Sequence, residues 1–199
     1  MHTVDLKSLK IEHDKDEEII RDIQTELFQK NGKGWFRIIS GSMYPLIEIS
    51  DRVLVKKINP SEIKLRDIIF FRNDNTFVTH RVIKLVKNDR KIMILQKGDA
   101  NNHASLIPPE IILGKVKTIE KRGKFLDLDS YQGRAINGFL GWQNFISYRL
   151  GLSIAPIKQQ LRDKPGFTLV MPFYQILKKP LRYMHRMMVR IVFLPTFFR

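Results

Sequence analysis

A loop near the first quarter of this 199-residue chain has the composition needed to present a nucleophilic hydroxyl. Residues 39–47 read ISGSMYPLI, so Gly41 separates Ser40 from Ser42 and Pro45 follows. Glycine lets the backbone approach a neighbour closely, and proline fixes the exit from a turn. Such a loop can hold the Ser42 hydroxyl while backbone N–H groups point at an acyl oxygen. Taken alone, however, it favours a polar turn between strands.

A serine that attacks a carbonyl group needs a base, and His80 is a candidate. It lies in the β-forming run FVTHRVI, where alternation puts it on the same face as Val78 and Val82. Imidazole titrates near neutrality and is the commonest general base. A lone histidine on such a face is more often a satisfied core or edge residue. A third segment, LQKGDANN at 95–102, places Asp99 after Gly98 and is typical of a hairpin turn.

Short strands are the elements that must position these side chains. From Trp35 onward, runs rich in β-branched and aromatic residues alternate with turn signals such as Asn59-Pro60 and Asn88-Asp89. We expect strands at 35–39, 52–57, 67–72, 76–86, 91–96 and 111–120. Several short strands with regular punctuation predict a mainly β, partly closed sheet domain.

The chain divides into three regions by pattern. Residues 1–34 hold one amphipathic helix at 16–30, residues 35–128 form the β-domain, and residues 129–199 form a basic, aromatic-rich helical region. In the first helix the apolar residues recur at helical spacing: Ile19, Ile20, Ile23, Leu27 and Phe28. In the last region prolines are expected to break the chain into short helices, beginning with Pro156.

The basic charge is concentrated at the C-terminus. The net charge is +15, and residues 115–199 alone carry 16 basic and 4 acidic side chains. Arg182, Arg186 and Arg190 follow one stripe among Met and aromatic residues, which is typical of an interfacial helix on an anionic membrane surface. A helix packed on the β-domain with a solvated arginine stripe is an equal alternative. No recognised nucleic-acid module accompanies the charge, so no nucleic-acid partner is expected.

Several classes of site are excluded or unsupported. The chain has no Cys, which excludes a disulfide framework, a thiolate zinc site and a cysteine nucleophile. His103 near Asp99 does not make a metal site, and no glycine-rich phosphate loop is present, so neither metal nor cofactor is expected. The N-terminus shows no secretory signal. The segment 135–157 is only a marginal candidate for a transmembrane helix.

Five motifs in one order resemble a known family. They are SGSMYP at 40–45, the strand DRVLV at 51–55, RDIIFF at 66–71, THRVI at 79–83 and KGDAN at 97–101. Together they resemble the boxes of type I signal peptidases, which are membrane-associated serine endopeptidases related to the self-cleaving repressor peptidases. The similarity covers about residues 35–116, less than half the chain. His80 stands where the common bacterial members have Lys, which resembles the archaeal and endoplasmic-reticulum-type enzymes.

The resemblance implies a role for each site residue. Ser42 would be the nucleophile, His80 the general base, and Asp99 the residue that orients and stabilises His80. The Ser42 N–H and the Ser40 hydroxyl would form the oxyanion hole. The implied partner is a protein or peptide that binds extended along a strand edge, with small residues before the cut.

The chain also departs from the family's pattern. An acidic amphipathic helix stands where typical signal peptidases have transmembrane helices, so membrane contact is expected through the C-terminal region. This leaves the side of the membrane open, the cytoplasmic face included. Two alternatives to the enzyme remain: a non-catalytic, membrane-peripheral peptide-binding module, and a self-cleaving regulator on nucleic acid. The sequence shows no Ala-Gly or Cys-Gly hinge ahead of Ser42, which argues against self-cleavage.

Overall fold

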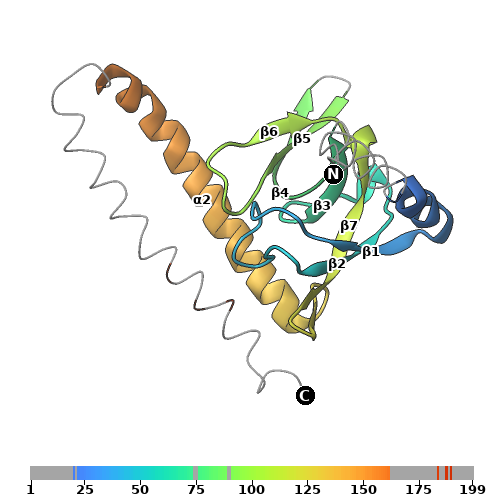
Figure 1. Cartoon of the computed structure of the whole chain (residues 1–199). Coiled ribbons are helices and arrows are strands. Elements are labelled where there is room, and N and C mark those ends of the chain that lie inside the picture. Colours follow the sequence, from blue (N-terminus) through green and yellow to red (C-terminus); the bar gives the residue numbers. More distant parts are fainter. Residues whose placement is uncertain are drawn as a thin grey trace, which may run out of the picture.

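The computed structural model describes residues 20, 22–73, 76–88 and 91–161, together with Tyr183, Met187 and Val189. In these residues an antiparallel sheet lies beside one long helix (Figure 1). The strands are β1 (Lys33–Arg37), β2 (Arg52–Lys56), β3 (Ile68–Asn73), β4 (Thr76–Asn88), β5 (Lys91–Lys97), β6 (Ser105–Ile107), β7 (Ile112–Lys121) and β8 (Lys124–Asp127). Two short 3-10 turns, η1 (Pro60–Glu62) and η2 (Pro109–Ile111), precede β3 and β7, and α2 spans Tyr131–Leu161.

The sheet is open and runs in the order β1-β2-β7-β3-β4-β5-β6, with β8 paired to β7. The mainly β fold with a C-terminal helix, expected from the sequence, is confirmed. The six expected strands lie within two residues of their predicted bounds, because each is a β-branched or aromatic run between turn residues. The short strands β6 and β8 were not expected. Each adds only three or four residues to an edge of the sheet.

The core consists of two clusters on opposite faces of β3. Ile68 and Phe70 belong to the larger cluster, whereas Ile69 and Phe71 belong to the smaller one. Successive side chains of a strand point to opposite faces, so the run IIFF buries both faces of β3. The larger cluster also receives residues from the serine loop, from β2 and β7, and from α2. The smaller cluster contains Val82 of β4 and Ile94 of β5.

Helix α2 packs against this sheet through Ile136 and Leu140, which are buried in the larger cluster (Figure 1). The predicted helix break at Pro156 is wrong, since α2 continues to Leu161. A proline removes one backbone hydrogen bond and can be accommodated by a kink rather than by a helix end. Within the described part of the chain, no helix is both long enough and apolar enough to cross a membrane.

The N-terminal helix is present at residue 20 and residues 22–31. Phe28 is buried and meets Phe36 of β1 edge to face, with ring centroids 5.7 Å apart. Ile20, Ile23 and Leu27 remain about half exposed, so the predicted apolar face is covered only at its C-terminal end. Residues 16–19 and the stripe Arg182, Arg186 and Arg190 lie outside the described residues.

Candidate active site

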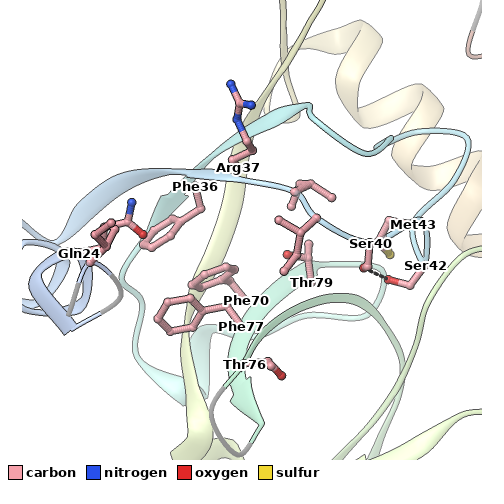
Figure 2. A pocket seen from close by; sticks show the side chains of 13 residues that line it. Gln24, Phe36, Arg37, Ser40, Ser42, Met43, Phe70, Thr76, Phe77 and Thr79 are labelled. Atoms are coloured by element: carbon pink, nitrogen blue, oxygen red, sulfur yellow. Dashed lines mark hydrogen bonds between the residues drawn. The ribbon is translucent and has the colours of Figure 1, made fainter. Parts of the chain in front are cut away.

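The serine loop lies between β1 and β2 and is held at both ends. Backbone bonds of 2.8 Å join the Ile38 N–H to the Asp51 carbonyl and the Ser50 N–H to the Ile38 carbonyl. Met43, Leu46 and Ile47 of the loop are buried in the larger core cluster. Apolar side chains therefore anchor the loop to the core, while the Ser42 and Ser40 hydroxyls lie at its surface. The two hydroxyl oxygens are 3.3 Å apart. The dashed line in Figure 2 marks this interaction.

A lysine from β7 fixes the other side of this loop. The ammonium group of Lys121 is 3.0 Å from the Pro45 carbonyl, 3.1 Å from the Glu48 carboxylate and 3.4 Å from the Asp51 carboxylate. Asp51 also accepts a 2.7 Å bond from the Glu48 N–H. Burial raises the pKa of Asp51, although this N–H and the Lys121 charge oppose the effect. The loop thus rests on a buried ion pair contributed by a distant strand.

The turn after β5 contacts the serine directly. The Ala100 N–H donates a 2.8 Å bond to the Ser42 carbonyl, and the Asn101 N–H bonds to the Gly98 carbonyl at 3.0 Å. A side chain at Gly98 would bring its Cβ within 2.6 Å of the Ser42 carbonyl oxygen. Only glycine permits so close a backbone approach. The motif containing Asp99 and the motif containing Ser42 therefore meet through the backbone.

His80 is positioned by β4, with Phe71 of β3 beside it and Gln96 of β5 as its hydrogen-bond partner. The imidazole Nδ1 lies 2.5 Å from the Gln96 Oε1. Since an amide oxygen can only accept, Nδ1 carries the proton in this contact and Nε2 is the basic nitrogen. Burial lowers the pKa of His80, and the positive charge of Lys97 adds to this, while the Gln96 bond and the Asp99 charge oppose it. A lowered pKa keeps the imidazole neutral at pH 7.

Asp99 binds Arg81 and not His80. The guanidinium donates two bonds to the carboxylate, 2.8 Å from Nε to Oδ1 and 2.6 Å from Nη2 to Oδ2, and both side chains are fully buried. Asn144 of α2 donates a further bond to Oδ1. Arg81 follows His80 in β4, so the two side chains point to opposite faces of the strand. Among the described residues, Asp99 thus influences His80 through its charge rather than through a hydrogen bond.

Residues 96–100 contact both Ser42 and His80. Ser42 is tied to the turn by its carbonyl, and His80 is tied to the same segment by Gln96. Among the described residues no hydrogen bond joins Ser42 directly to His80. Sequence reasoning missed Gln96, because its place opposite Val82 depends on a register shift between Val82 and Lys84 that turn residues do not predict. It also missed Asn144, for which no local pattern exists, because its contact depends on how α2 packs.

An apolar pocket of about 280 Å³ opens beside the serine loop. Figure 2 shows Ser40 and Ser42 at one end, Gln24 of the N-terminal helix at the other, and three phenylalanine rings between them. These rings, Phe36, Phe70 and Phe77, have centroids 4.4 to 5.7 Å apart. Such a pocket can take apolar side chains of a ligand whose backbone lies near Ser42.

The described residues contain no cluster of three or more His, Asp or Glu side chains able to hold a metal ion. The described residues instead provide a loop-presented hydroxyl beside an apolar pocket, and an imidazole whose Nδ1 is hydrogen-bonded to Gln96. These are the parts required for nucleophilic attack on an acyl group, followed by transfer to water.

Comparison with known proteins gives a partial match. No protein-family model matches the chain. Over 73 residues the chain is 37% identical to signal peptidase I W of Bacillus subtilis (strain 168). The match covers 36% of this chain, and the chain spans only 38% of that relative's length. Over this stretch the protein is related to signal peptidase I.

Proposed function

We propose that the protein is a signal-peptidase-like serine endopeptidase in which Ser42 is the nucleophile and His80 the general base. The observation that supports this most strongly is the connection of both residues to the segment 96–100. The relationship to signal peptidase I points to the same reaction class. Asp99 takes an electrostatic role in this proposal, because its hydrogen bonds go to Arg81 and Asn144.

The proposed reaction has two halves. The Ser42 Oγ attacks the scissile carbonyl carbon while His80 Nε2 takes the hydroxyl proton. The tetrahedral intermediate then expels the amine, which receives that proton from His80, and an ester forms on Ser42. A water molecule attacks the ester, again giving a proton to His80 Nε2. When the second intermediate collapses, the proton returns to Ser42 and the free acid leaves.

The negatively charged oxygen of each tetrahedral intermediate needs hydrogen-bond donors to stabilise it. In this proposal the Ser42 N–H and the Ser40 hydroxyl supply them, since the Ser40 Oγ lies 3.3 Å from the Ser42 Oγ. Removing one such donor usually costs about 3–4 kcal/mol of transition-state stabilisation. Asp99 stabilises the imidazolium that forms on His80 through its charge.

The proposed substrate is a protein or peptide segment bound in an extended conformation. The apolar pocket supports this, because it begins at Ser42 and continues along the phenylalanines to the N-terminal helix. A preference for small residues next to the cut is taken from the resemblance to signal peptidases. The pocket's apolar lining adds an expectation that the residues before the cut are uncharged.

An anionic membrane surface is the second proposed partner. Along α2, apolar side chains point to solvent at Trp142, Phe145, Leu150 and Leu152, and each is between 39% and 54% exposed. The helix contains no Asp or Glu. Exposed aromatic and aliphatic residues on a helix without acidic groups are typical of a helix that lies on a lipid surface.

The mechanism is tested by replacing Ser42 or His80 with alanine. Each variant should lose cleavage of a quenched-fluorescent peptide with small residues before its scissile bond. Treatment of the full chain with a serine-reactive acylating probe should modify Ser42, as located by mass spectrometry. Ser105→Ala is the matched control, because Ser105 is exposed on β6.

Undiminished cleavage by Ser42→Ala or His80→Ala would overturn the mechanism. Absence of probe labelling and of cleavage in the folded wild-type protein would instead favour a non-catalytic peptide-binding module. Circular dichroism and thermal unfolding of each variant distinguish a lost reaction from a lost fold.

A further inference from the structure

Two asparagines of helix α2, one buried and one partly exposed, hydrogen-bond to a group of buried charged side chains near the turn at residues 98–100. Asn144 is 4% exposed, and so is Lys97, while the side chains of Arg81 and Asp99 are fully buried. Asn137 lies two turns earlier on the same helix. No step of the proposed mechanism uses either asparagine, so their hydrogen bonds to buried charges require another explanation.

Asn144 binds two opposite charges at once. Its Oδ1 accepts a hydrogen bond from the Lys97 ammonium, and its Nδ2 donates one to the Asp99 carboxylate. Asparagine suits this position because it offers an acceptor and a donor without adding charge. A leucine at this position would remove one hydrogen bond from the Lys97 ammonium and one from the Asp99 carboxylate. Losing a hydrogen bond to a buried charged group destabilises the fold.

Asn137 fixes the other end of the group. Its Oδ1 accepts a bond from the Arg81 guanidinium, and its Nδ2 donates to the Arg66 carbonyl at 3.2 Å. Arg81 in turn holds Asp99 through two bonds. A continuous series of hydrogen bonds therefore leads from α2 through Asp99 to the turn at residues 98–100.

This turn is the part that contacts Ser42. The Ala100 N–H binds the Ser42 carbonyl, and the Gly98 backbone packs against the same oxygen. Lys97 immediately precedes the turn, and its ammonium also bonds to the Gly98 carbonyl at 3.3 Å. Displacing Asp99 or Lys97 must therefore move the peptide groups that hold Ser42 in place.

We propose that Asn144 is a positioning residue, which places the Ser42 carbonyl and balances the charges near His80 by holding Asp99 and Lys97. The inference rests on the proposed function for its effect on catalysis. Its structural part stands independently, because the Ala100–Ser42 bond exists whether or not the protein is an enzyme. The charged groups whose fields act on His80 are Asp99 and Lys97, one favouring and the other opposing protonation.

The test uses the full chain with Asn144→Leu, and Arg149→Leu as the matched control on an exposed position of the same helix. Hydrogen exchange at the Ala100 amide reports the bond to Ser42 without any reaction. We expect Asn144→Leu to speed this exchange at least tenfold and to lower kcat for the quenched-fluorescent peptide by roughly 10- to 100-fold, with KM little changed. Arg149→Leu should leave both readouts unchanged.

A second variant, Asn144→Asp, keeps the side chain's shape and its acceptor for Lys97 but adds negative charge beside Asp99. We expect the acid limb of its kcat/KM profile to move to higher pH, because added negative charge favours the imidazolium of His80. A purely structural role would lower thermal stability without moving this limb.

The possible outcomes separate the two proposals. Unchanged Ala100 exchange and unchanged kcat in Asn144→Leu would overturn the positioning role, even if Ser42→Ala is inactive. Faster Ala100 exchange in Asn144→Leu, combined with full activity of Ser42→Ala, would retain the structural contact and overturn the proposed mechanism. If Asn144→Leu fails to fold, an unshifted acid limb in Asn144→Asp overturns the inference.

Discussion

His80 gains its tautomer from Gln96, whereas its low pKa comes chiefly from burial. Gln96 accepts the Nδ1 proton at 2.5 Å and so leaves Nε2 as the basic nitrogen. Asp99 contributes only its charge, because Arg81 and Asn144 occupy its oxygens. The orienting function that the resemblance assigned to Asp99 thus falls to a neutral amide. This division has consequences that can be measured through pH.

We expect kcat/KM to fall as the pH drops, with a midpoint below the ordinary histidine pKa of about 6.5. The reason is that burial lowers the pKa of His80, so the base stays neutral until a more acidic pH is reached. The measurement is the pH dependence of peptide cleavage by the wild-type chain. A midpoint well above 6.5 would contradict the assignment of His80 as the base.

Substitutions at Gln96 should move this midpoint in opposite directions. Gln96→Glu places a carboxylate on Nδ1, which favours the imidazolium and raises the midpoint. Gln96→Leu removes a bond that raises the pKa of His80, so the midpoint falls, and kcat falls as well because the tautomer is no longer fixed. Identical profiles in both variants would show that Gln96 does not act on the catalytic base.

The serine loop shows how one strand controls the position of a segment far from it in the chain. Lys121 ends β7, yet it contacts the loop at Pro45, Glu48 and Asp51. Lys121 and Asp51 are both more than 90% buried, so the pair is shielded from solvent. Removing one partner of a buried pair leaves an uncompensated charge, which is usually more costly than losing a surface pair.

Lys121→Met should therefore lower the free energy of unfolding by about 3 kcal/mol, as measured by urea denaturation. Lys117→Met is the control, because its partner Asp129 is 55% exposed, and the expected loss is below about 1 kcal/mol. Adding Asp51→Asn to Lys121→Met should restore part of the stability by removing the unpaired carboxylate. Equal losses for the two lysines would contradict the buried-anchor interpretation.

The molecule as a whole combines an open sheet with a helix that supports it on one side and exposes apolar residues on the other. Ile136 and Leu140 of α2 are buried in the larger core cluster, whereas Trp142 and Phe145 point outward. The strongly positive C-terminal part of the chain adds attraction to anionic surfaces.

We expect the full chain to co-sediment with vesicles containing anionic phospholipid, and to do so less at high salt. Replacing both Trp142 and Phe145 with serine should weaken binding about tenfold or more, since each half-exposed aromatic contributes about 1 kcal/mol when buried in lipid. Ile92→Ser is the control, because Ile92 is equally exposed on β5. Unaltered sedimentation of the double variant would exclude this face of α2 as the contact surface.

Local sequence patterns were sufficient for the strands, for the loop around Ser42 and for the place of His80 within a strand. Residue alternation, turn residues and a glycine between two serines act over a few neighbouring positions, so they can be interpreted without a structure. Hydrogen bonds and ion pairs between elements far apart in the chain cannot be predicted in this way. Arg81 rather than His80 binds Asp99 because strand alternation and the packing of β4 against the turn decide which side chain reaches the carboxylate. Asn144 and Lys121 contact the site only because α2 and β7 pack beside it. Helix α2 continues through Pro156, although proline usually interrupts a helix.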